Sequence, residues 1–166
     1  MVQIFTDRVA QGISECERAL ALDRNLGSAH MNIGLAEYFI GRVEEVEAHI
    51  NEALRLSPRD TSANIWIAIA GMAKLVLGND EEAIVLLRRS IEINRNYPLA
   101  HFFLAAAQAH LGRMNEARAA AKTGLALNPT FTIRRFRAGA MSDNPIYLAQ
   151  RERVCDGMRK AGVPAG

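Results

Sequence analysis

Cysteine, proline and aromatic residues are all scarce in this chain, and neither charge is in strong excess. Its 166 residues include two cysteines and five prolines, with 6% aromatic residues and a formal net charge of +2. The widely separated Cys16 and Cys155 predict free thiols, which suit a reducing, cytoplasmic location. The longest apolar run, 65–73, is about half of the roughly 20 residues that a membrane-spanning helix needs, so we expect no membrane partner. The small net charge and the lack of an aromatic stacking platform disfavour nucleic acid as a partner.

Internal repetition is the dominant feature of the sequence. Four similar apolar segments follow one another at steps of 34, 37 and 34 residues, at 19–22, 53–56, 90–93 and 124–127. Glycines recur with the last two of these steps, as Gly41, Gly78 and Gly112. Several columns that share one uneven spacing indicate structural repeats.

Each repeat contains two helical patterns separated by the recurring glycine. In the clearest repeat, the first helix is predicted from about Ser28 to Ile40 and the second from about Val43 to Leu56. Gly41 suits the left-handed residue that closes a helix. Gly34 in the first helix lets the two antiparallel backbones approach closely. The pattern therefore predicts an all-α protein of antiparallel helix pairs, with no plausible strand.

These units resemble tetratricopeptide repeats (TPRs), which are helix-turn-helix modules of about 34 residues. The resemblance covers roughly residues 10–129 and implies a right-handed α-α superhelix, a TPR solenoid, with a C-terminal capping helix. The expected organisation is a half-repeat, three repeats and a cap, at 1–26, 27–60, 61–97 (with a three-residue insertion), 98–131 and 132–166. A chain that starts in mid-repeat suggests a piece of a longer protein.

The cap is expected to contain a helix at about 145–160. Its start is marked by Asn144 as the capping residue and Pro145 in the first turn. The residues expected to face inward from this helix are Ile146, Leu148, Val154 and Met158.

The sequence contains no recognisable enzyme signature. Phosphate-binding loops, dinucleotide-binding fingerprints and nucleophile elbows are absent, so we expect neither an enzyme nor a cofactor. The histidines lack the cysteine or carboxylate spacing of zinc sites, which predicts no metal; they are His30, His49, His101 and His110. Acidic pairs such as Glu44 and Glu45 are interpreted as favourable charges at the start of second helices.

The resemblance implies that binding occurs in a concave groove lined by the first helices of successive repeats. Residue by residue, this assigns the groove to Met31, Leu35, Tyr38, Phe39, Met72, Leu75, Phe102 and His110. An equally weighted alternative places Met31, Tyr38, Met72 and Phe102 in the core. The groove lacks the cations of TPR domains that grip a chaperone's carboxylate. An apolar groove favours an amphipathic helix or an extended hydrophobic segment, either from a protein partner or from the parent chain.

Polar residues occupy the slot where the family carries a tyrosine in the first helix: Glu37, Lys74 and Gln108. We expect them to stack on neighbouring helices as a polar ladder. An ion pair between Glu37 and Lys74 is one form that this ladder could take, and a purely structural role is the favoured alternative.

Positive charge gathers toward the end of the chain. Residues 1–111 carry 10 basic and 14 acidic side chains, whereas residues 112–166 carry 10 and 4. The candidate basic patch consists of Arg134, Arg135, Arg137, Arg151 and Arg153. Such a patch suits an acidic partner, and the competing interpretation is a solvated cap.

The C-terminal stretch carries a second, narrower resemblance. The segments 131–134, 142–145, 151–153 and 161–164 are similar to the C-terminal end of bacterial class III adenylate/guanylate cyclase-related proteins that carry TPRs. This resemblance implies a signalling protein as the parent. The first hypothesis is therefore a non-catalytic interaction module of such a protein. The second is a homodimerisation scaffold for the parent, because class III cyclases form their active sites between two subunits.

Overall fold

The computed structural model describes the backbone of residues 2–166 and the side chains of residues 9–166, so Met1 of the expected half-repeat lies outside the described residues. In this part of the chain there are nine helices and no strand, which confirms the all-α prediction. The helices are α1 (Val2–Leu22), α2 (Gly27–Phe39), α3 (Val46–Leu56), α4 (Ala63–Val76), α5 (Asp80–Ile93), α6 (Pro98–His110), α7 (Met114–Leu127), α8 (Ile133–Ala138) and α9 (Pro145–Lys160).

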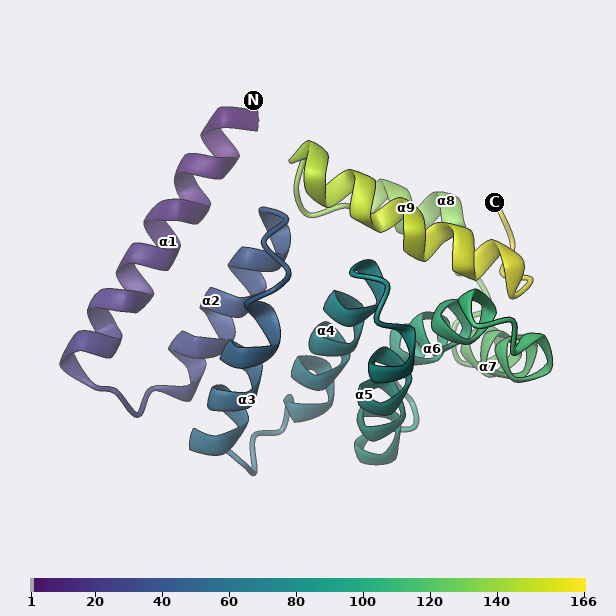
Figure 1. Cartoon of the computed structure of the whole chain (residues 1–166), viewed down its shortest axis with the longest axis horizontal. Helices are drawn as coiled ribbons and strands as arrows, with labels where there is room; N and C mark the ends of the chain where they lie inside the picture. The colour runs from purple at the N-terminus through teal and green to yellow at the C-terminus, as the bar shows by residue number, and fades with distance from the viewer. Residues whose placement is uncertain (1) are drawn as a thin grey trace.

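Three helix hairpins, α2/α3, α4/α5 and α6/α7, stand side by side in a curved row (Figure 1). The long helix α1 packs against α2 at one end of this row. Each hairpin therefore shields the apolar side of the next one, as in a repeat solenoid.

The hairpins turn at the recurring glycines. Gly41, Gly78 and Gly112 have φ values of 82°, 84° and 73°, the left-handed region that glycine adopts without steric cost. After α2, the amide of Gly41 donates to the Tyr38 carbonyl and the amide of Arg42 to the Glu37 carbonyl. These bonds satisfy the last carbonyls of the helix. The predicted role of Gly41 as a helix-closing residue is confirmed.

The structure corrects one helix boundary and confirms the close approach at Gly34. Helix α3 begins at Val46, three residues after the predicted start, because residues 43–45 form a turn that buries Val43. A Cβ atom on Gly34 would lie 3.2 Å from the Cβ of His49 on α3. The two helices therefore pack at a distance that leaves almost no room for a larger side chain.

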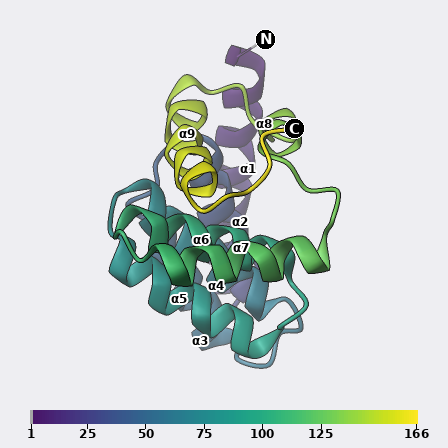
Figure 2. The same cartoon turned by 90° about the vertical axis from the view of Figure 1, so that its right-hand side faces the viewer.

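The C-terminal segment folds back over the hairpins instead of continuing the row beyond α7. Helix α9 lies along one side of α4 and α6 (Figures 1 and 2). At the crossing, a Cβ atom on Gly157 would lie 2.7 Å from the carbonyl oxygen of Ala106 in α6. At its other end, the Gln150 side-chain amide donates to the Gly41 carbonyl at 3.1 Å. Helix α9 thus connects the first hairpin to the third.

The start of α9 is fixed by local capping. The Asn144 side chain accepts hydrogen bonds from the amides of Ile146 (2.9 Å) and Tyr147 (3.2 Å), and Pro145 occupies the first turn. The Asn144 side chain satisfies two of the free amide groups at the helix start, and Pro145 has no amide hydrogen that would need a partner.

The inward face of α9 differs in part from the expected one. Val154 and Met158 are fully buried as predicted, but Ile146 and Leu148 are 57% and 39% exposed. The inward stripe instead contains Tyr147, Arg151, Val154, Cys155 and Met158, at helical spacing. Ile146 and Leu148 flank Tyr147 on either side, so the burial of Tyr147 turns both of them outward.

Among the helices of the described residues, none combines the length and the apolar character that crossing a membrane requires.

Candidate functional site

Half of the predicted groove residues are buried by the chain itself. Tyr38, Leu75 and Phe102 are 1%, 0% and 0% exposed, and Met72 is 8% exposed. The Tyr38 ring meets Tyr147 of α9 edge-on, with ring centroids 5.4 Å apart. The Phe102 ring stacks on Phe131, with centroids 3.9 Å apart. The C-terminal segment therefore covers the middle and the far end of the face where a partner was expected.

The other four predicted groove residues are half-buried: Met31, Leu35, Phe39 and His110. Met31 and Phe39 pack against the core. The imidazole Nε2 of His110 donates to the carbonyl oxygen of Arg153 at 2.9 Å, which attaches α6 to α9. His110 is thereby engaged within the chain, whereas Leu35 and Phe39 also line open space.

Two arginines of the predicted basic patch hold α9 in place. Arg151 is 7% exposed, and its guanidinium carbon lies 3.8 Å from the ring centroid of Phe136. It donates to the Tyr147 hydroxyl at 3.0 Å and to the carbonyl of Phe136. Arg153 donates to the Leu75 carbonyl at 2.8 Å and to both carboxylate oxygens of Asp80 at 2.9 and 2.7 Å. Neither guanidinium is therefore left available as a free surface cation.

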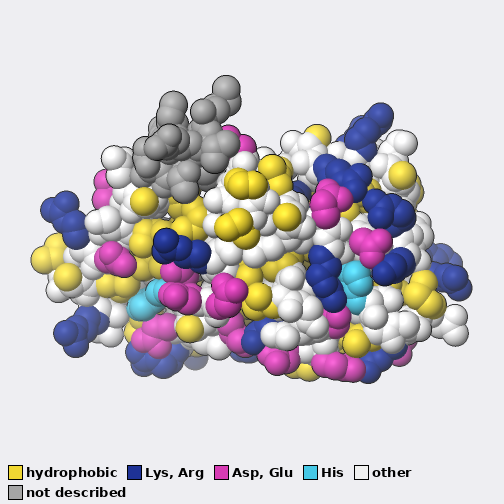
Figure 3. All heavy atoms as spheres, turned by 45° about the horizontal axis from the view of Figure 1, so that its top comes forward, with side chains coloured by type: hydrophobic (Ala, Val, Ile, Leu, Met, Phe, Trp, Pro, Cys, Tyr) yellow, Lys and Arg dark blue, Asp and Glu magenta, His cyan; other side chains and the backbone are white. Residues whose placement is uncertain are grey.

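The remaining three arginines of that set are exposed: Arg134, Arg135 and Arg137. Arg135 donates to the Thr130 carbonyl at 2.7 Å, and Arg137 pairs with Glu152. On the face that carries α9, basic and acidic side chains are interspersed and do not form a single patch (Figure 3). Two of the five predicted arginines therefore hold the fold together, and the other three lie on a surface where basic and acidic side chains alternate.

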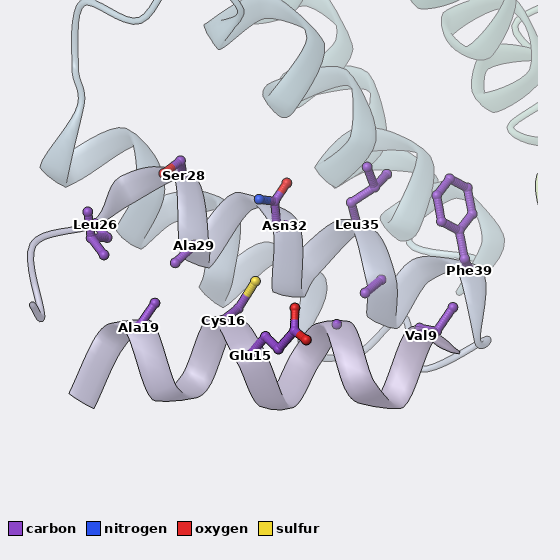
Figure 4. A pocket seen from close by; sticks show the side chains of 12 residues that line it. Val9, Glu15, Cys16, Ala19, Leu26, Ser28, Ala29, Asn32, Leu35 and Phe39 are labelled. Atoms are coloured by element: carbon purple, nitrogen blue, oxygen red, sulfur yellow. The ribbon is translucent and has the colours of Figure 1, made fainter. Parts of the chain in front are cut away.

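An open apolar groove lies between α1 and α2. This α1–α2 groove encloses about 520 Å³ and is lined by Val9, Gly12, Glu15, Cys16, Ala19, Leu26, Ser28, Ala29, Asn32, Leu35, Ala36 and Phe39. Cys16 and Glu15 point from α1 toward α2 (Figure 4). Of the predicted groove residues, Leu35 and Phe39 belong to this lining.

Both walls of the α1–α2 groove follow the same helical spacing. On α1 four of the five lining residues lie at 9, 12, 16 and 19, and on α2 four of the six lie at 29, 32, 36 and 39. Since a helix rises about 1.5 Å per residue, these stripes run for about 15 Å along each helix. A second space of about 250 Å³, beneath α8 and α9, shares Leu35 and Phe39 with it. The two spaces therefore meet at these two side chains.

The polar residues Glu37, Lys74 and Gln108 each face an acidic residue. Glu37 and Lys74 do not pair with each other. Lys74 Nζ lies 2.6 Å from Glu82 and 2.7 Å from Glu47, so the alternative of a Glu37–Lys74 pair is wrong. In the third hairpin, the Gln108 amide donates to Glu116 at 3.1 Å. In both hairpins the slot residue thus binds a carboxylate at the start of the second helix of its own hairpin.

Glu37, Glu45 and His49 form a cluster that the sequence analysis did not predict. Their nearest ligand-type atoms all lie within 4.8 Å of one another. Burial, reinforced by the charge of Glu45, raises the pKa of Glu37 to about 7 although Arg42 opposes the shift. Burial and His30 lower the pKa of His49. The available signal was the spacing of Glu45 and His49, since residues four apart share one helix face.

Comparison with known proteins agrees with the observed architecture. Residues 77–138 match the tetratricopeptide repeat family. The structure of MamA is similar to this one: the matched region covers 90% of this chain and 84% of the MamA chain, with 21% sequence identity and a TM-score of 0.67. YrrB, a TPR protein with an unusual peptide-binding site, is similar to 93% of this chain over 77% of its own, at 20% identity and a TM-score of 0.65.

A thermophilic TPR protein of Thermus thermophilus, TTC0263, is similar to 96% of this chain over 87% of its own, at 20% identity and a TM-score of 0.58. No curated protein sequence matches the chain. These similarities agree with the stacked helix hairpins and with the glycine turns at the repeat spacing, which all indicate the same repeat architecture. Residues 77–138 match the tetratricopeptide repeat family, and the chain as a whole has the fold of a TPR solenoid.

Proposed function

We propose that this chain is a non-catalytic module that binds an apolar, helical segment of a protein partner in the α1–α2 groove. The observation that carries the proposal is the pair of matching stripes on α1 and α2, which line one open, apolar channel. The channel lies on the α1 side of the region that α8 and α9 cover and meets that region at Leu35 and Phe39.

The shape of the groove favours a peptide over a compact ligand. Its volume of about 520 Å³ falls within the range of about 300–1,000 Å³ that small-molecule pockets also have, so volume alone does not discriminate. Its length of about 15 Å corresponds to about 10 residues of helix. An amphipathic helix laid in such a channel would place an apolar residue every three or four positions against the two stripes. The similarity of YrrB, which has a peptide-binding site, supports the same class of ligand.

Peptide selection on the immobilised chain tests this proposal. Random 16-residue peptides are selected by display, and the affinities of the winners are measured in solution by fluorescence anisotropy. We expect apolar residues at helical spacing, and at least tenfold weaker binding to Leu35→Glu, which places a charge in the groove. Val85→Glu is the matched control, because Val85 is 68% exposed on α5 and should leave the affinity unchanged. Equal binding to Leu35→Glu would reject the proposed site.

The two cysteines offer an independent test of the same groove. Cys16 lines the groove, whereas Cys155 is 0% exposed in the core. N-ethylmaleimide should therefore modify Cys16 selectively and abolish binding of the selected peptides. Cys16→Ser should bind the peptides and be insensitive to the reagent. Loss of binding by the treated Cys16→Ser protein would show that the reagent acts elsewhere.

Two further forms of the proposal concern the source of the bound segment. In the homodimer form, a second copy fills the groove, and sedimentation equilibrium should show a dimer that Leu35→Glu dissociates. In the parent-chain form, the segment belongs to a bacterial cyclase-related signalling protein. That context is supported by the resemblance of the C-terminal stretch, and the test is whether the gene encodes a cyclase domain in the same reading frame.

A further inference from the structure

The polar slot of the first hairpin differs chemically from those of the other two. In the second and third hairpins an ammonium or an amide donor meets an acidic residue, through Lys74 to Glu82 and Gln108 to Glu116. Glu45 is the residue at the corresponding place in the first hairpin, 37 positions before Glu82. It faces Glu37, which is itself a carboxylate. The first hairpin thus brings two carboxylates together, whereas each of the other two hairpins pairs a carboxylate with a hydrogen-bond donor.

Glu37 is deeply buried in this arrangement. The residue is 6% exposed, and its Oε2 has no hydrogen-bond partner within the part of the chain that the structure describes. The same oxygen lies 3.8 Å from His49 Nε2, which is too long for a hydrogen bond. A buried carboxylate oxygen without a partner costs free energy unless a cation or a donor reaches it.

The histidine pair sets the direction of the His49 ring. Nδ1 of His30 and Nδ1 of His49 are 3.2 Å apart and share a hydrogen bond. Because that contact occupies Nδ1 of His49, its Nε2 is the nitrogen that faces Glu37. Metal-binding histidines commonly have one ring nitrogen held by a hydrogen bond, which fixes the direction of the nitrogen that binds the metal.

We propose that Glu37, Glu45 and His49 bind a divalent transition-metal ion, with Zn²⁺ as the ion that fits best. His30 acts as the positioning residue for His49. One imidazole nitrogen and two carboxylate oxygens are ligands that zinc accepts at about 2.0–2.2 Å. Atoms bound at that distance in a tetrahedron lie about 3.4 Å apart. The pair at 3.8 Å is close to this value, and the exposed Glu45 side chain supplies the remaining movement.

The expected role of the ion is to clamp the first hairpin. Glu37 belongs to α2, His49 belongs to α3, and Glu45 precedes α3, so one ion would join both helices at their turn. Three protein ligands leave a fourth position of the tetrahedron for water or for a group from a partner. Binding of the ion stabilises the folded state by mass action, because the unfolded chain lacks the assembled site.

Isothermal titration calorimetry of the chelator-treated chain with ZnCl₂ at pH 8 tests the proposal. We expect one ion per chain and a higher thermal unfolding temperature with the ion present. Glu37→Gln and His49→Gln should each weaken binding at least tenfold and remove the thermal shift. His30→Gln should weaken binding by about tenfold, since it removes only the support of His49.

Glu44→Gln is the matched control, because it removes an exposed acid next to Glu45 without touching the cluster. It should bind zinc as the unaltered chain does. Zinc affinity that persists in both Glu37→Gln and His49→Gln would overturn the proposal in favour of adventitious surface binding. Absence of zinc binding at pH 8 would also overturn it. Circular dichroism confirms that each variant is folded.

Discussion

A single methyl group added at Gly157, where α9 crosses α6, is expected to loosen the C-terminal helix. A Cβ atom there would lie 2.7 Å from both the Cβ and the carbonyl oxygen of Ala106 and 2.8 Å from its Cα. Because these are backbone atoms and an attached methyl, no side-chain rotation relieves the contact. Helix α9 must therefore move away from α6 in Gly157→Ala.

The size of the effect follows from two opposing contributions. Replacing a mid-helix glycine by alanine stabilises a helix by about 0.8–1.0 kcal/mol when the site is open. Forcing an extra methyl group into a packed contact costs about 1–3 kcal/mol. The expected net loss for Gly157→Ala is about 1 kcal/mol, which lowers the unfolding temperature of a chain of this size by about 2–4 °C.

Gly12→Ala is the matched control, because Gly12 lies in α1 with no atom within 4 Å of an added Cβ. It should raise the free energy of unfolding by up to about 1 kcal/mol. Differential scanning calorimetry measures both variants, and hydrogen exchange of the α9 amides locates the change. If both variants stabilise the protein equally and α9 stays protected from exchange, the packing of α9 on α6 is refuted.

Three further predictions concern an ion pair, an aromatic stack and a thiol. Arg153→Met removes the partner of the buried Asp80 carboxylate, so urea unfolding should show a loss of about 1–3 kcal/mol. Phe102→Ala removes a fully buried ring that stacks on Phe131, and calorimetry should show a loss of about 3–5 kcal/mol. Burial and, secondarily, the charge of Glu15 raise the pKa of the Cys16 thiol above its ordinary value, so its alkylation rate should still be increasing with pH at pH 9.

Each of these predictions has a control and a contrary outcome. Arg137→Met removes a pair between two exposed side chains and should cost less than about 1 kcal/mol. A similar loss for Arg153→Met would show that Asp80 does not depend on its partner. Retention of full stability by Phe102→Ala would place its ring outside the core. Glu15→Gln should shift the alkylation profile of Cys16 to lower pH, and an unchanged profile would exclude the charge as a cause.

The repeat architecture was predictable because each of its signals is local. Gly41 and its counterparts close first helices in a conformation that favours glycine, and the repeat spacing carries that signal through the chain. The cap at Asn144 is equally local, since its side chain bonds amides two and three residues ahead. Local signals of this kind need no knowledge of which helices meet in space.

The position of α9 was not predictable from the same kind of signal. Its inward stripe includes Arg151, which sequence patterning assigns to the surface. Burial of that guanidinium depends on the Phe136 ring beneath it and on two acceptors, the Tyr147 hydroxyl and the Phe136 carbonyl. These partners come together only in the folded chain, so the burial of Tyr38 and Phe102 beneath the C-terminal segment was left as one of two alternatives.

The cluster around Glu37 was missed for a related reason. Glu45 and His49 lie four residues apart at the start of α3, but the third member of the cluster lies on the preceding helix. The close approach at Gly34 brings α2 and α3 near enough for the three side chains to meet. Interpreting Glu45 only as a favourable charge at a helix start concealed its second role.

The bonds that α9 makes with distant turns alter how the whole chain is expected to unfold. In a simple stack, each hairpin contacts only its neighbours, so single hairpins can fray independently. Here Gln150 bonds Gly41 across 109 positions and Arg153 bonds Leu75 across 78. Because these hydrogen bonds join separate hairpins, we expect the hairpins to unfold together in one cooperative transition. Their high sequence separation also slows folding, because the hairpins must be assembled before the last helix can join them.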